Sequence, residues 1–171
     1  RDHFTGKDKL LTLMKEAREI DMVGITLQHN WGNDPHFIDL LQERSNPDEC
    51  RFRIMTSHPD SRIVKQRDKE EALEFQSQPT RIARDAETSL KSFYSVYSKL
   101  QQKDKPYLAI RAITETNIYC SIIRVDDLMV VTKYLLSCRG SKSTTLEIEG
   151  RNTPFFEKYM REFDQMWELA A

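Results

Sequence analysis

The sequence predicts one α/β domain, built on a mixed, mostly parallel sheet flanked by helices. Short apolar runs rich in β-forming residues alternate with amphipathic runs of helical period along the first half of the chain. Further on, two apolar runs within Ile118–Leu136 are separated only by Asp126 and Asp127, whose side chains favour a turn, so this stretch predicts a β-hairpin. A length of 171 residues, with 31% charged and 39% hydrophobic residues, fits a single core spanning residues 1–171.

Charge and hydropathy argue against several classes of protein. The net charge of −1 gives no general attraction to nucleic acid or to an anionic membrane. No apolar run approaches the roughly 18 residues that a membrane span requires, and the charged start Arg1–Lys9 does not resemble a secretory signal. We therefore expect a cytoplasmic protein with no membrane partner.

The cysteines favour neither a disulfide framework nor a zinc site. Cys50, Cys120 and Cys138 are an odd number and lack the close spacing of metal ligands. We expect buried, reduced thiols, and we expect no metal and no other cofactor.

The first half of the chain predicts a β-α-β unit preceded by a short helix. The apolar residues of Lys7–Arg18 recur at helical spacing. The chain opens without Met, and we expect it to be a domain excised from a longer multidomain protein. Met22–Gln28 reads as a buried strand, and Asp34 followed by Pro35 begins a helix. Cys50–Thr56 is the next strand. The crossover favours a parallel pair, so the polar residues that end both strands should lie side by side.

A charged segment and a long helix follow. Ser61–Pro79 is rich in charges of both signs, which predicts a solvated helix or loop, with an anion-binding loop as the alternative. Thr80 is the expected N-cap of the longest helix, Arg81–Gln102, whose apolar residues repeat every three to four positions. Arg81 and Arg84 in its first turn could hold an anion at the helix N-terminus, or could form surface ion pairs.

The last third of the chain supplies strands and a final helix. Thr153 followed by Pro154 begins that helix by the same cap-and-proline pattern. The expected strands are Tyr107–Ile113, the two hairpin runs Ile118–Val125 and Leu128–Leu136, and Thr144–Glu149.

The hairpin sequence Ile122-Ile-Arg-Val-Asp-Asp-Leu-Met-Val-Val131, and the return of the chain to a final helix ending in Phe163-Asp-Gln-Met-Trp167, resemble the phospholipase D-like superfamily. More narrowly, the chain resembles the single-copy phospholipase D-like domains of bacterial regulatory and signalling proteins. The resemblance covers most of the chain in element order. It implies a phospholipase D-like fold and pairing of two copies around a shared cleft.

Active members of this superfamily carry His-x-Lys, four further residues and then Asp on the hairpin. If Asp126 is that aspartate, the lysine position is Ser121 and the histidine position is Tyr119. Serine brings no positive charge, and a phenol with a pKa near 10 is a poor nucleophile at neutral pH. Shifting the motif to Asp127 places Cys120 at the histidine position and Ile122 at the lysine position, and this arrangement is no better for phosphate binding. The resemblance therefore implies a catalytically degenerate site.

The preferred hypothesis is a non-catalytic sensory, ligand-binding or dimerisation domain of a bacterial regulatory or defence protein. We expect it to bind a nucleotide or another phosphate-bearing small molecule, to form a homodimer, and to serve an effector or regulatory domain on its N-terminal side. The residues expected to bind the ligand are Gln28, His29, Asn30, Ser57, His58, Arg81, Tyr119, Ser121, Arg124 and Asp126.

Alternative functions remain open at the level of sequence. A divergent phosphodiesterase or nuclease would use His29 or His58 in place of the missing histidine. A purely structural oligomerisation module is a further alternative. The spacing of His29, His36 and His58 does not require a metal site. Cys120 could act as a nucleophile with His29 or His58 as base, but it lies in the middle of an expected strand, where a packing role is the expectation.

Overall fold

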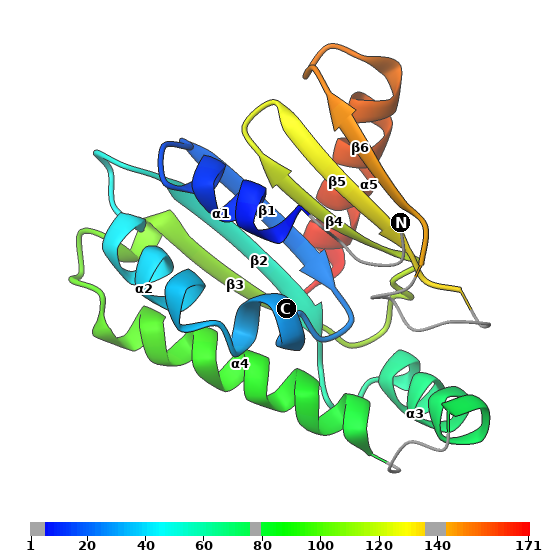
Figure 1. The fold of residues 1–171 in the computed structure, drawn as a ribbon. Coiled ribbons are helices and arrows are strands. Elements are labelled where there is room, and N and C mark those ends of the chain that lie inside the picture. Colours follow the sequence, from blue (N-terminus) through cyan, green and yellow to red (C-terminus); the bar gives the residue numbers. More distant parts are fainter. Residues whose placement is uncertain (1–5, 76–79, 136–142) are drawn as a thin grey trace.

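The computed structural model describes residues 6–75, 80–135 and 143–171 as an α/β fold, in which a six-stranded mixed sheet is flanked by helices (Figure 1). The strand order is β3-β2-β1-β4-β5-β6. The strands are β1 (Glu19–Gly24), β2 (Arg51–Ser57), β3 (Leu108–Ile113), β4 (Cys120–Val125), β5 (Leu128–Lys133) and β6 (Thr145–Glu149). The helices are α1 (Lys7–Met14), α2 (Pro35–Arg44), α3 (Arg62–Phe75), α4 (Arg81–Lys99) and α5 (Pro154–Leu169), with short helical turns η1 (Gln28–Gly32) and η2 (Lys105–Tyr107).

The two halves of the sheet differ in strand direction. β1, β2 and β3 pair in parallel, which confirms the β-α-β interpretation of the first half. β4 pairs antiparallel with β1, and the pairings of β4 with β5 and of β5 with β6 are also antiparallel. The expectation of a mostly parallel sheet is therefore wrong. The two-residue turn at Asp126 and Asp127 can connect only antiparallel neighbours, and it determines the direction of the second half.

The two faces of the sheet are covered by different helices (Figure 1). Alternation along β1 sends Met22 into a core with α1, α2 and α4, and sends Val23 into a core with α5. Phe93 of α4 is fully buried in the first core, and Phe163 of α5 is fully buried in the second. No helix of the described residues is long and apolar enough to cross a bilayer.

Two of the three predicted helix caps are confirmed. The Asp34 carboxylate accepts a hydrogen bond from the backbone N–H of His36 at 2.9 Å, and the Thr153 hydroxyl accepts one from Phe156 at 3.4 Å. Thr80 instead adopts a left-handed backbone with φ of 69° and makes no capping hydrogen bond through its side chain. The prediction of a Thr80 cap is therefore wrong.

The carboxylate of Asp68, on α3, takes the place of that cap. Its two oxygens accept hydrogen bonds from the first-turn amides of α4, Ile82 at 2.7 Å and Ala83 at 3.2 Å. The charged segment predicted as a solvated helix or loop thus forms α3, while residues 76–79 of that segment lie outside the described residues.

Strand boundaries differ from the prediction at β1 and at the hairpin. β1 begins three residues earlier than expected and ends at Gly24, because Glu19 and Asp21 find arginine partners within the sheet. The hairpin is confirmed, but its expected last residue, Leu136, lies outside the described residues, as does Cys138.

Candidate functional site

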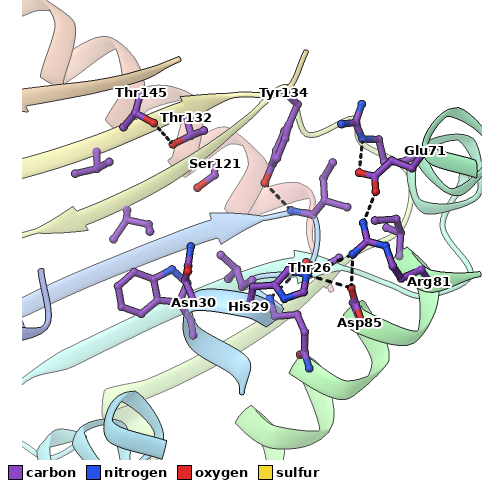
Figure 2. A pocket seen from close by; sticks show the side chains of 18 residues that line it. Thr26, His29, Asn30, Glu71, Arg81, Asp85, Ser121, Thr132, Tyr134 and Thr145 are labelled. Carbon is purple, nitrogen blue, oxygen red and sulfur yellow. Dashed lines mark hydrogen bonds and ion pairs between the residues drawn. The ribbon is translucent and has the colours of Figure 1, made fainter. Parts of the chain in front are cut away.

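A cavity of about 380 Å³ lies against the sheet face that also carries α4, close to the point where β1 leads into η1 (Figure 2). Strands β4, β5 and β6 form its floor. The chain from Ile25 to Trp31 forms one wall, and α3 and the start of α4 form the other. Its lining is Ile25, Thr26, Leu27, Gln28, His29, Asn30, Trp31, Arg67, Glu71, Arg81, Ile82, Asp85, Ser121, Ile123, Val130, Thr132, Tyr134 and Thr145.

The floor combines apolar surface with hydroxyl groups. Ser121 and Ile123 lie on the cavity side of β4 and alternate with residues on the other face of the sheet. In the antiparallel register, Ser121 is opposite Thr132 of β5 and Ile123 is opposite Val130. The hydroxyls of Thr132 and Thr145 are 3.0 Å apart and hydrogen-bonded. A flat apolar group could therefore rest on the floor while neighbouring hydroxyls bind polar atoms.

The η1 wall is fixed to α4 through a buried polar contact. The Ser89 hydroxyl donates a hydrogen bond to Oε1 of Gln28 at 2.7 Å, so Gln28 has a structural partner. A Cβ at Gly32 would lie 2.6 Å from Oγ of Ser89, so η1 can approach α4 this closely only with glycine at that position. His29 and Asn30 follow Gln28, and the His29 side chain is 73% exposed at the cavity.

Charged side chains from α3, α4 and η1 meet at one end of the cavity (Figure 2). Arg81 forms an ion pair with Glu71, and its Nη1 lies 3.2 Å from Asp85. Nε of Arg67 lies 3.3 Å from the second oxygen of Glu71. Nε2 of His29 is 3.3 Å from Nη1 of Arg81 and 3.9 Å from Asp85. Glu70 also lies 3.5 Å from Nη1 of Arg67, so two guanidinium groups and three carboxylates form a cluster beside the imidazole.

Tyr134 borders the cavity as a neutral hydrogen-bonding group. Its hydroxyl oxygen accepts a hydrogen bond from the backbone N–H of Ile25 at 3.0 Å, at the end of β1. Burial raises the pKa of the Tyr134 hydroxyl to about 12, because the charged phenolate would lose its hydration. The phenol stays protonated across the physiological range and holds the wall in place.

The structure brings together half of the predicted site. Gln28, His29, Asn30, Arg81 and Ser121 all line the cavity. They come from β4, α4 and the chain that follows β1, which is the edge of the sheet where the sequence predicted a site.

Three other predicted residues lie outside the cavity. Ser57 is fully buried at the end of β2, and its hydroxyl has no hydrogen-bond partner among the described residues. His58 lines a separate hollow with residues of α3, and its imidazole is 3.9 Å from Asp60. Tyr119 is 71% exposed and does not line the cavity. The expected convergence of Tyr119, Ser121 and the strand ends is therefore wrong for Tyr119, Ser57 and His58.

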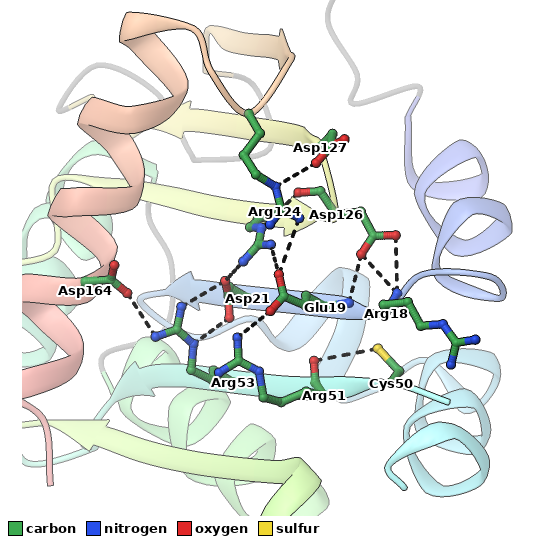
Figure 3. Close-up of polar contacts among 11 residues, drawn as sticks. Arg18, Glu19, Asp21, Cys50, Arg51, Arg53, Arg124, Asp126, Asp127 and Asp164 are labelled. Atoms are coloured by element: carbon green, nitrogen blue, oxygen red, sulfur yellow. Dashed lines mark hydrogen bonds and ion pairs between the residues drawn. The ribbon is translucent and has the colours of Figure 1, made fainter. Parts of the chain in front are cut away.

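Arg124 and Asp126 lie at the opposite end of β4 from Ser121 (Figure 3). The five residue steps from Ser121 to Asp126 span about 16 Å in an extended strand. Arg124 forms ion pairs with Asp21, at 2.7 Å, and with Glu19. Both residues therefore serve the sheet and lie apart from the cavity, because one strand cannot bring its two ends together.

The Asp126 carboxylate joins the hairpin turn to the start of β1. It accepts hydrogen bonds from the backbone N–H of Arg18 at 3.0 Å and of Glu19 at 2.9 Å. Asp126 itself has a φ of 51°, a left-handed conformation that aspartate tolerates better than most residues. Its role in the turn needs no ligand.

Most of the cavity lining was not predicted from the sequence. The residues not predicted include Arg67, Glu71, Asp85, Thr132 and Tyr134. Arg67 and Glu71 are four residues apart, as are Arg81 and Asp85, which is the spacing of ion pairs on a helix surface. That spacing was the available signal, but it does not show that the two pairs face each other.

The described residues contain no group of three or more His, Cys, Asp or Glu side chains that could hold a metal ion. Cys120 is buried, and burial raises the pKa of its thiol to about 11, so it does not supply a thiolate nucleophile at neutral pH.

Comparison with known proteins identifies the fold and the family. TrmBL2, described as an archaeal chromatin protein with a novel mode of DNA binding, is 14% identical with a TM-score of 0.55. The match covers 99% of this chain and 52% of the TrmBL2 chain, so this chain spans about half of that protein and shares its fold there. No curated protein matches the sequence. A family model described as a domain of unknown function, DUF5919, matches residues 7–171, and the chain belongs to that family.

Proposed function

We propose that this domain is a non-catalytic, ligand-binding sensory domain, which holds a nucleotide or another phosphate-bearing small molecule in the cavity beside Arg81. The observation that carries the proposal is the arrangement of the cavity. Arginines from two helices meet at one end, and an apolar floor edged with hydroxyls lies beside them. Pockets that combine apolar surface with a few convergent polar groups are typical of small-molecule sites.

Each part of such a ligand has a matching surface. Guanidinium groups bind phosphate oxygens through paired hydrogen bonds, and Arg81 and Arg67 present two of them. Ser121 and Asn30 offer hydrogen bonds to sugar hydroxyls. Ile123, with the apolar floor around it, could contact a flat base.

We propose a non-catalytic domain because of the residues that the hairpin carries at the motif positions. The phospholipase D-like resemblance places the lost histidine at Tyr119, which is exposed and does not line the cavity, and the lost lysine at Ser121, which lines it. A site with an uncharged serine at that position can hold a phosphate ester without a nucleophile to attack it. The phospholipase D-like ancestry is part of the proposal.

Thermal unfolding measured against a library of nucleotides and sugar phosphates tests the site. A ligand should raise the melting temperature of the wild-type domain and of Arg84→Ala, which removes an arginine from the same helix but outside the cavity lining. The shift should disappear in Arg81→Ala. If no ligand shifts the wild type, or if the shift survives Arg81→Ala, the cavity is not the phosphate site.

One observation favours the alternative of a divergent phosphodiesterase. His29 lies beside both a carboxylate, Asp85, and a guanidinium group, Arg81, which are the neighbours of a histidine acting on a phosphodiester. Hydrolysis of bis(p-nitrophenyl) phosphate, with and without EDTA, distinguishes the two functions. Turnover that is lost in His29→Ala but kept in His58→Ala, whose imidazole lies in another hollow, would establish the enzyme.

The biological setting belongs to the same proposal. We expect the domain to work in the cytoplasm as a homodimer, joined to an effector or regulatory domain of a bacterial signalling or defence protein. Light scattering at tens of micromolar should give the mass of two chains, against 20.2 kDa for one chain. A single-chain mass would refute the dimer and would leave the cavity proposal unaffected.

A further inference from the structure

The carboxylate of Glu71 occupies the position between the two arginines of the cavity. One oxygen lies 3.3 Å from Nε of Arg67, and the other pairs with Nη2 of Arg81. Only 6% of the Glu71 side chain is exposed. A single oxyanion held by two guanidinium groups is also the arrangement in which proteins hold a phosphate.

The charge balance of the cluster depends on Glu71. Arg67 and Arg81 bring two positive charges, and Glu70, Glu71 and Asp85 bring three negative charges. Without Glu71, Arg67 keeps Glu70 and Arg81 keeps Asp85, but each guanidinium group loses the carboxylate oxygen nearest to it in a largely buried site, which is unfavourable. A phosphate group carries between one and two negative charges at neutral pH and three acceptor oxygens, so it can replace the carboxylate and bond more donors.

Glu71 is also part of the attachment of α3 to α4. Two acidic residues of α3 contact the first turn of α4: Asp68 accepts from backbone amides, and Glu71 pairs with the Arg81 side chain. Val64 of α3 is buried in an apolar cluster and Ile63 packs against the same cluster, while Leu73 is 86% exposed. An element held by so few apolar contacts is one that a local change can loosen.

We propose that Glu71 is an internal occupant of the phosphate position, and that a phosphate-bearing ligand exchanges with it at Arg67 and Arg81 and thereby loosens α3 from α4. This inference rests on the proposed function and adds the means by which binding changes the structure. Glu71 leaves the guanidinium groups and becomes hydrated, and the attachment of α3 then depends on Asp68 and on its packing. The displaced helix is the signal that a bound ligand presents to a neighbouring domain.

Titration with inorganic phosphate by calorimetry tests the exchange. Glu71→Gln removes the competing charge and should bind phosphate at least about tenfold more tightly than the wild type, since one strong competitor is absent. Glu87→Gln is the matched control, because Glu87 is an exposed glutamate of α4 that pairs with Lys91 outside the cavity. Its affinity should equal that of the wild type. Equal affinity in Glu71→Gln, or no detectable phosphate binding by any variant, overturns the exchange.

Hydrogen exchange of the wild-type domain gives a second test that needs no folded variant. Saturating phosphate should speed exchange of the α3 amides, Arg62–Phe75, by several-fold and leave the amides of α5 unchanged. Unchanged or slower exchange in α3 overturns the inference. If Arg81→Ala abolishes phosphate binding while Glu71→Gln fails to strengthen it, the proposed site stands and only the exchange is wrong. Binding that survives Arg81→Ala refutes the site itself.

Discussion

The cap that α3 provides for α4 gives a quantitative prediction about stability. Asp68→Ala removes the acceptor for the N–H groups of Ile82 and Ala83, which are hydrogen-bonded at 2.7 and 3.2 Å. Loss of an N-cap acceptor costs about 1 kcal/mol, with a range of about 0.5–2, and loss of a negative charge at a helix N-terminus adds about 0.3–1. We expect Asp68→Ala to lower the free energy of unfolding by about 1–2 kcal/mol.

Thr80→Ala is the matched substitution, because threonine occupies the position where a local cap was predicted. Its side chain makes no capping hydrogen bond, and its φ of 69° is unfavourable for a β-branched residue. Replacing it with alanine removes no bond and relieves some crowding. We expect a change of less than about 0.5 kcal/mol, in the range usual for surface substitutions.

Urea unfolding followed by circular dichroism measures both variants on the same scale. A loss of about 1–2 kcal/mol in a domain of this size corresponds to a fall of roughly 2–8 °C in melting temperature. The result that would refute the reasoning is a loss in Thr80→Ala as large as that in Asp68→Ala. Such a result would mean that the cap is local and that α3 does not stabilise the start of α4.

Three further predictions concern buried polar groups. Burial opposes ionisation of Glu19, but Arg124 and neighbouring arginines outweigh this effect and hold the pKa of the Glu19 carboxyl below its ordinary value. The stability that Glu19 contributes is therefore present above about pH 4.5 and is lost as the pH falls through the lowered pKa. Glu19→Gln should flatten the pH dependence of the unfolding free energy between about pH 5 and about pH 3. Burial raises the pKa of the Cys50 and Cys120 thiols to about 12 and about 11, so peptide mapping should find both unmodified by iodoacetamide at pH 8 until urea unfolds the domain. Tyr134→Phe leaves a backbone N–H without its acceptor and should cost about 1–3 kcal/mol in urea unfolding; a loss below about 0.5 kcal/mol would show that water replaces the hydroxyl.

The parts of the fold that the sequence predicted well are those set by neighbouring residues. Asp34 and Thr153 cap their helices with side-chain oxygens that accept hydrogen bonds from first-turn amides, and the proline directly after each marks the helix start in the sequence. The hairpin follows from Asp126 and Asp127 between two β runs, and the parallel pairing of β1 with β2 follows from the length of the crossover.

The errors occur where a side chain finds its partner far along the chain. Asp68 caps a helix that begins 13 residues later, and no local pattern marks it as a cap. Glu19 and Asp21 lie within a strand because arginines on neighbouring strands neutralise them, whereas alternation alone places the strand later. Only part of the cavity lining was predicted, for the same reason. The charged lining residues of α3 come from a segment whose position depends on contacts with α4.

The geometry of the hairpin changes what its aspartate implies about function. At the level of sequence, the phospholipase D-like resemblance implies that Asp126 is the retained member of a phosphodiesterase motif. In the structure its carboxylate binds the amides of Arg18 and Glu19, and its backbone N–H donates to the carbonyl of Glu19 at 2.9 Å. These bonds give the aspartate a structural reason to be there whether or not a ligand binds. The case for ligand binding therefore depends on Ser121 at the other end of β4 and on the arginines that line the same cavity, and the variants at Arg81 and Glu71 test that cavity.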